Sequence, residues 1–182
     1  MKSYYVYPLA SGKRDPRINA LLNLHIMKFK TIFNEEIDCP CMGCVVADNT
    51  KFKQGRIYQS ALWDLSQDFE IAHPGMVVLS PMRHVSSYAD LTPDELKELS
   101  NLTIHCKKAI KKIFSCEDVS FSFYEKKDGH VHFVIIPLAG IKDKYSVLRE
   151  LMSKAEYLRT DKENMIRVVK AIDDFREYFK AL

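Results

Sequence analysis

A long amphipathic segment near the middle of the chain limits the fold more than any other feature. Thr92-Pro93-Asp94-Glu95 is a capping box with proline at the first helical position. Apolar residues then recur at helical spacing, which predicts a long helix with one buried face. Cys106 falls on that face and is best explained as a core residue. The face consists of Leu96, Leu99, Leu102, Cys106, Ile110 and Ile113.

Two strand-like segments follow this helix. Val119, Phe121 and Phe123 alternate with other side chains, which predicts a strand with one buried face. After a turn over residues 126–129, the apolar run that starts at His130 predicts a second strand, closed by Pro137. The two strands are expected to form a hairpin.

The remainder of the chain divides into three parts. Residues 1–37 are predicted to be a helical extension, with Asp15 as its cap, Pro16 in its first turn and a stripe that ends at Phe33. Residues 38–140 form the main domain, with short strands near 56–58, 69–71 and 76–79. Residues 141–182 are predicted to be a helical tail, packed on its own domain or in a dimer. Its second helix is predicted to start with a capping box from Thr160 to Glu163.

The composition is that of an ordinary globular protein. A formal net charge of +3 is too small to indicate a partner among nucleic acids or anionic membranes. Lysines 107, 108, 111 and 112 line the outer face of the predicted helix, and a solvated face explains them. No apolar run is long enough to span a membrane, and the N-terminus lacks the core of a signal peptide. We therefore expect a cytoplasmic protein whose five cysteines are reduced.

Two histidines share one face of the predicted strand. Side chains alternate across a strand, so His130, His132 and Val134 point to the same side. Imidazoles in an apolar run are costly to bury unless each has a partner. Structural, hydrogen-bonded histidines are one interpretation, but the roles of histidine as nucleophile, proton carrier and metal ligand favour a functional one.

Cys41 and Cys44 form a Cys-x-x-Cys pair, which is half of a tetrahedral zinc site. His84 and His130 are the best candidates for the other two ligands. The alternatives are buried cysteines or a redox pair, and a redox pair is expected to open a helix. Residues 45–48 indicate a strand and turn instead. Cys39 leaves open a different pairing, with Cys41 or Cys44.

Taken in chain order, the motifs between Cys41 and Pro137 resemble those of the histidine triad superfamily. The most specific part runs from Pro74-Gly75 to Arg83-His84-Val85 and is followed by Leu91-Thr92-Pro93-Asp94-Glu95-Leu96. A His-x-His strand closed by proline completes the pattern. The similarity covers somewhat over half of the chain.

The resemblance implies an α+β fold with an antiparallel sheet, a long helix and a homodimer. It implies a nucleotide or nucleotide conjugate as ligand and a nucleotidyl hydrolase or transferase activity. His132 matches the histidine that attacks the α-phosphate and forms a nucleotidyl-histidine intermediate. The structural zinc of some members maps onto Cys41, Cys44, His84 and His130.

Two departures from the family pattern concern catalysis. Val134 stands at the third histidine position, where it can neither bind a phosphate nor relay a proton. The Gly-Gln-Ser/Thr phosphate-binding turn is missing, and only Lys126 or Lys127 offers positive charge there. Two alternatives to an enzyme therefore stay open. One is a zinc-stabilised nucleotide-binding or interaction module, and the other is a structural zinc protein without a nucleotide site.

Overall fold

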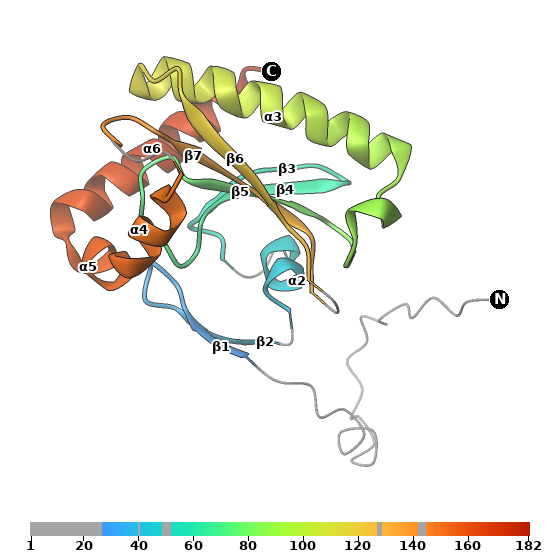
Figure 1. Ribbon diagram of the computed structural model, residues 1–182, viewed down its shortest axis with the longest axis horizontal. Coiled ribbons are helices and arrows are strands. Elements are labelled where there is room, and N and C mark those ends of the chain that lie inside the picture. The colour runs from blue at the N-terminus through green and yellow to red at the C-terminus, as the bar shows by residue number, and fades with distance from the viewer. Residues whose placement is uncertain (1–26, 40, 49–51, 127–128, 142–144) are drawn as a thin grey trace, which may run out of the picture.

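The computed structural model describes residues 27–39, 41–48, 52–126, 129–141 and 145–182. Its centre is a five-stranded antiparallel sheet with the strand order β3-β4-β5-β7-β6 (Figure 1). This sheet and the helices around it give the α+β architecture that the sequence predicts. None of the described helices is long and apolar enough to cross a membrane. The strands are β3 (Arg56–Gln59), β4 (Trp63–Gln67), β5 (Val77–Pro81), β6 (Val119–Tyr124) and β7 (His132–Pro137).

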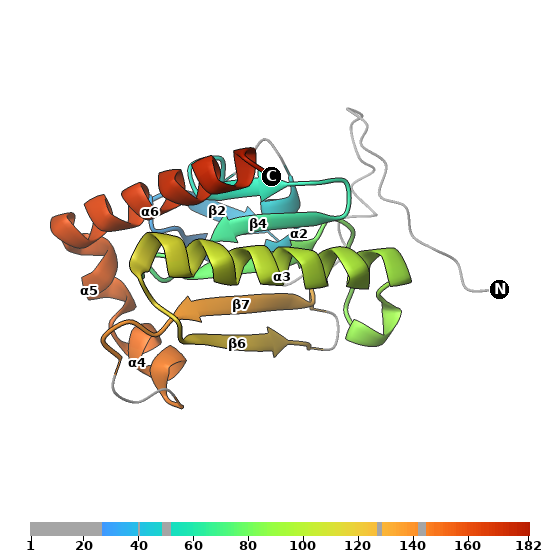
Figure 2. The same cartoon turned by 90° about the horizontal axis from the view of Figure 1, so that it is seen from above.

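The long helix α3 (Pro93–Phe114) crosses one face of the sheet, as Figure 2 shows from above. The predicted capping box is present: Thr92 Oγ1 accepts a hydrogen bond from the Glu95 amide at 3.2 Å, and the Glu95 carboxylate accepts one from the Thr92 amide at 2.7 Å. Both bonds satisfy amides that a helix start leaves unpaired. Cys106 is fully buried, as predicted.

The two faces of β7 belong to two different apolar clusters. Phe133 and Ile135 pack toward α3 in the larger cluster. Val134 and Ile136 face the other way and pack against the C-terminal helix α4 (Val147–Ser153). Strand alternation thus divides the core into two layers. The face that carries His132 and Val134 is the one that α4 covers.

The C-terminal tail continues through α5 (Ala155–Thr160) into α6 (Lys162–Lys180), which packs on β3 and α3 of its own chain. The capping box predicted from Thr160 is wrong by one residue. Asp161 caps α6 by accepting hydrogen bonds from the amides of Glu163 and Asn164, at 3.0 and 3.2 Å. The Thr160 hydroxyl instead donates to the Glu156 carbonyl oxygen at 3.0 Å, because Thr160 is the last residue of α5.

The helix predicted to end at Phe33 is wrong over its described part. Strands β1 (Met27–Lys30) and β2 (Glu36–Cys39) form a hairpin, on the opposite side of the main sheet from α3 (Figure 1). Thr31 Oγ1 accepts hydrogen bonds from the amides of Phe33 and Glu35, and these bonds favour a turn over a helix. Residues 1–26, with Asp15, Pro16 and His25, lie outside the described residues.

Two expectations about strands also need correction. Residues 69–71 form a turn, because the Asp68 carboxylate accepts the amide hydrogen bonds of Glu70 and Ile71 at 2.9 and 2.8 Å. The strand in this region is β4, which ends at Gln67. The apolar face of β6 is only half-buried, since Phe121 and Phe123 are 48% and 50% exposed on an edge strand.

Candidate zinc centre and histidine site

The Cys-x-x-Cys pair lies at the start of a short helix. Cys41 is the N-cap of α2 (Met42–Ala47), and Cys44 lies in its first turn. The strand and turn predicted for residues 45–48 are therefore wrong. The sequence argument against a redox pair fails with them, and the surroundings of the two thiols must decide their role.

Side chains from the sheet fix the far end of α2. The Arg56 guanidinium donates to the carbonyls of Val46 and Asp48 and forms an ion pair with Asp64 at 2.8 Å. Gln59 donates to the Ala47 carbonyl at 3.2 Å. These bonds satisfy the carbonyls that a helix end leaves unpaired. They hold α2 against β3 and β4, and so set the position of its cysteines.

Two histidines from distant segments meet the cysteine pair. His84 follows β5, and His130 precedes β7. Cys41 Sγ lies 3.5 Å from Nδ1 of both histidines, and Cys44 Sγ lies 3.3 Å from Nδ1 of His84 and 3.6 Å from Nδ1 of His130. All four ligand atoms lie within 4.8 Å of one another. The structure thus brings together the four residues predicted as metal ligands.

This geometry fits a structural zinc ion. Sulfur and nitrogen ligands on one tetrahedral zinc ion are about 3.6 Å apart, given their usual bond lengths. The second ring nitrogen of His130 lies 2.9 Å from the Pro81 carbonyl, so Nε2–H donates to it and leaves Nδ1 for a metal. Four protein ligands leave no coordination position for a reacting water, so such an ion is structural.

Gly43 is part of the same site. A Cβ atom at this position would lie 2.3 Å from Cγ and 2.5 Å from Nδ1 of His130. Any other residue at position 43 would therefore displace the His130 ring. The glycine lets the helix start approach the imidazole closely enough for the two side chains to share a metal.

The two thiols of the pair titrate together. Hydrogen bonding with Cys44 lowers the pKa of Cys41 to about 3, and the same contact raises the pKa of Cys44. Thiols bind metal as thiolates, so metal binding requires Cys44 to lose its proton as well. Cys39 is not in the cluster, because it is buried and its Sγ contacts Met42 Sδ at 3.4 Å.

His132 lies beside the cluster on β7 and is held in one orientation. Its Nδ1 is 3.0 Å from the His130 carbonyl oxygen, so the ring donates from Nδ1 and keeps its lone pair on Nε2. The Tyr124 ring stacks on the imidazole with a centroid distance of 5.2 Å and an angle of 17°. A neutral imidazole with a free Nε2 lone pair is a competent nucleophile.

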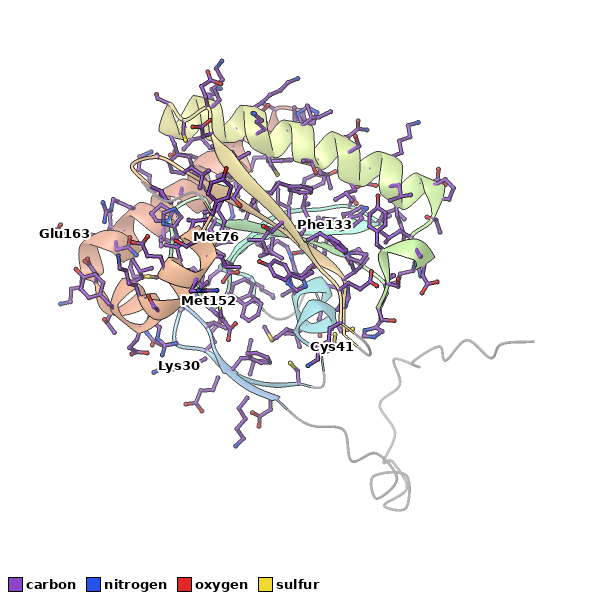
Figure 3. The ribbon with its side chains drawn as sticks, viewed as in Figure 1. Lys30, Cys41, Met76, Phe133, Met152 and Glu163 are labelled. Atoms are coloured by element: carbon purple, nitrogen blue, oxygen red, sulfur yellow. The ribbon has the colours of Figure 1, made fainter. Side chains whose placement is uncertain are left out.

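A cavity of about 370 Å³ lies on this face of the sheet. The strands contribute Tyr124, His132 and Val134 to its lining, and the turn after β4 contributes Asp68 and Glu70. Helices α4 and α5 form the remaining side, to which Met152 of α4 belongs (Figure 3). The volume is in the range of small-molecule sites.

Asp68 and Arg159 both line this cavity, and the sequence analysis assigned neither of them a role. Burial raises the pKa of Asp68 to about 6, although its carboxylate accepts two amide hydrogen bonds. Asp68 follows β4 directly, a position that could have been noticed if that strand had been predicted correctly. Arg159 lies far along the chain in α5, and no sequence signal connects it to His132.

Val134 contributes only an aliphatic side chain to this cavity. It is 4% exposed and packs with Met76, Ile136 and Leu151 beneath α4. Lys126, one of the two turn lysines considered as a source of positive charge, is exposed and does not line the cavity. Lys127 lies outside the described residues.

Solved structures resemble this chain, although no protein-family model matches it. A zinc-bound histidine triad family protein from Mycobacterium smegmatis has a TM-score of 0.56 and 14% identity, over 78% of this chain and 97% of that one. A hypothetical histidine triad nucleotide-binding protein from Sulfolobus tokodaii has a TM-score of 0.54 and 19% identity, over 77% and 94%. The diadenosine triphosphate hydrolase of Plasmodium falciparum has a TM-score of 0.52 and 17% identity, over 85% of each chain.

These likenesses agree with the strand order and with the long helix across the sheet. Each covers more than three quarters of this chain, so the similarity extends over the sheet and its surrounding elements. The chain therefore has the fold of the histidine triad proteins.

Proposed function

We propose that the protein is a zinc-stabilised member of the histidine triad superfamily that transfers or hydrolyses a nucleotidyl group through His132. The observation that carries this proposal is the imidazole of His132, which donates from Nδ1 and lines the cavity. The Sulfolobus protein is described as nucleotide-binding and the Plasmodium protein as a diadenosine triphosphate hydrolase, which supports the same ligand class.

The reaction would proceed in two displacements at phosphorus. His132 Nε2 forms a bond to the α-phosphorus, and the bond from phosphorus to the leaving group breaks with its electron pair. Water then attacks the same phosphorus, loses a proton, and releases Nε2, so that the nucleoside monophosphate leaves. An acceptor other than water would make the protein a transferase. Splitting one displacement into two lowers each barrier.

The zinc ion would be held by Cys41, Cys44, His84 and His130 as a structural support. When bound, it supplies a fixed tetrahedral anchor rather than an activated water. His130 would then fix the start of β7, and the His130 carbonyl in turn orients His132. Fixed geometry is a large part of catalysis at such a centre. Thiolate ligands require a reducing compartment, in keeping with the cytoplasmic location expected from the sequence.

A nucleotide-binding module without turnover is the second candidate. Val134 at the third position of the motif is aliphatic and almost fully buried, so it cannot donate a hydrogen bond to a phosphate. Such a protein would keep the zinc centre and the cavity and would bind nucleotide without forming an adduct.

We also propose a homodimer through the edge strand β6 and the neighbouring face of α3. An apolar groove on this surface is lined by Ile104, Phe121 and Phe123, which are about half exposed. Edge strands have unpaired backbone groups that readily pair with another chain. Phe123→Glu should convert a dimer to a monomer in multi-angle light scattering, and a wild-type protein of monomer mass would contradict this assembly.

Denaturing mass spectrometry after brief mixing tests the proposed activity. The panel contains adenylyl and guanylyl phosphoramidates and dinucleoside polyphosphates. A nucleotidyl adduct on the wild-type protein that is absent from His132→Ala would establish covalent catalysis, provided that the variant keeps its zinc. If no ligand gives an adduct or a product but nucleotides raise the melting temperature, the binding module is the correct function.

A further inference from the structure

The C-terminal helices do more than cover the sheet, because they form one side of the cavity beside His132. Leu148 and Met152 of α4 and Ala155 and Arg159 of α5 all line it. A ligand in this cavity would touch the tail as well as the strands.

Arg159 is the one residue with a permanent positive charge in the described lining of this cavity. Its side chain is 21% exposed and forms an ion pair with Glu156, and Nη1 lies 3.5 Å from the Lys30 carbonyl oxygen. The side chain is thus held at the junction of α5 with the β1–β2 hairpin. A guanidinium presents a planar set of donors that matches phosphate oxygens.

Two carboxylates share the cavity with this cation. Asp68 lies in the turn after β4, and the exposed Glu70 interacts electrostatically with Arg159. A carboxylate repels phosphate but accepts hydrogen bonds from hydroxyl groups. A ligand that fits all of these groups has hydroxyls as well as an anionic phosphate.

We propose that Arg159 is the phosphate-positioning residue of this cavity for a nucleoside phosphate. That the ligand is a nucleotide is taken from the proposed function, on which this inference rests. Arg159 would supply the phosphate contact that Val134 and the shortened turn before His130 cannot make. Glu70 is then a competitor, because its negative charge interacts with Arg159 in the same cavity and repels a phosphate.

Titration calorimetry with paired probes tests this assignment. Adenosine and AMP, guanosine and GMP, and inorganic pyrophosphate are each titrated into the full-length, zinc-loaded protein. The wild type should prefer the monophosphate to its nucleoside by about tenfold or more, the usual effect of a hydrogen bond to a charged group. Arg159→Gln should remove this preference without changing the affinity for the nucleoside, and Arg159→Lys should retain part of it.

Two further variants separate binding from a purely structural role. Glu70→Gln should increase the affinity for AMP or GMP, because it removes the competing carboxylate. Arg149→Gln changes an exposed arginine of α4 that does not line the cavity, and it should bind as the wild type does. Thermal melts of all variants establish that each is folded at the temperature of the titration.

The possible failures are distinct. If Arg159→Gln keeps the full preference for the monophosphate, the role of Arg159 is overturned and the nucleotide function stands. If pyrophosphate binds to the wild type but not to Arg159→Gln, and no nucleotide binds, the phosphate role of Arg159 is supported and the nucleotide ligand is overturned. If no probe binds to the wild type, both proposals are overturned.

Discussion

Arg83 and Glu95 form a bidentate ion pair, with Nε–Oε1 and Nη2–Oε2 distances of 2.7 Å each. Arg83 directly precedes the candidate zinc ligand His84, and Glu95 lies in the first turn of α3. The same carboxylate also accepts the Thr92 amide hydrogen bond of the capping box. The buried Glu95 carboxylate therefore positions both the segment that contains Arg83 and His84 and the start of α3, the longest helix.

Glu95→Gln should destabilise the protein by about 2 kcal/mol at neutral pH, because a buried charge-assisted pair is lost. The hydrogen bonds from Arg83 lower the pKa of Glu95 below its ordinary value of 4.5. The stabilisation is thus present above 4.5 and is lost as the pH falls through the lower folded-state value. Urea denaturation over a pH series measures this effect. Asp94→Asn, an exposed change in the same turn, is the control and should show a smaller loss.

Gly43→Ala should lower the zinc content of the purified protein. The new methyl group would lie 2.3 Å from the His130 ring and displace one ligand of the cluster. Metal analysis measures the stoichiometry, and a chelator should lower the melting temperature of the wild type more than that of the variant. Gly140→Ala is the control: no atom lies within 4 Å of the added Cβ, but a φ of +73° makes the substitution strained, so it should lower the melting temperature without lowering the zinc content. Full zinc occupancy in Gly43→Ala would contradict the assignment of His130 as a ligand.

Val134→His should not increase nucleotidyl transfer, although it completes the His-x-His-x-His pattern of the family that the sequence resembles. The side chain is buried in the apolar cluster beneath α4, where an imidazole without a partner costs about 2 kcal/mol or more. A lower melting temperature with no gain in nucleotidyl transfer is expected. Val134→Leu, which keeps the site apolar, should cost less. A rise in turnover in Val134→His would show that α4 leaves this position during the reaction.

Asp68→Asn should stabilise the protein at alkaline pH. Burial raises the pKa of Asp68 from 3.8 to about 6, so the folded protein loses stability as the pH rises through this range. Above pH 6 the variant should be more stable than the wild type by roughly 1–3 kcal/mol, and below 3.8 the difference should vanish. Thermal melts across pH measure the difference. A pH-independent effect of the substitution would contradict the raised pKa.

The sequence was most informative where the residue types themselves determine the chemistry. Thr92 and Glu95 predicted the start of α3, and two cysteines with two histidines predicted a cluster that the structure assembles. Local pattern misled where distant side chains decide the conformation. Val45 and Val46 suggested a strand, but Arg56 and Gln59 hold the end of a helix there.

Arg159 could not have been found from its neighbours in the chain. Its sequence context is that of an ordinary helix with an ion pair to Glu156. Only the packing of α4 on the Val134 face of the sheet places α5 beside His132. Tertiary placement of this kind leaves no periodic or spacing signal in a single sequence.

The helix above Val134 also bears on which side chains this position accepts. Once α4 shields the third position of the motif from water, an imidazole there becomes a liability and an aliphatic side chain an advantage. The helical tail and the valine at this position are then two parts of one packing arrangement rather than independent features. Homologues that keep histidine at this position should lack an apolar helix over it, and those with such a helix should carry valine, isoleucine or leucine.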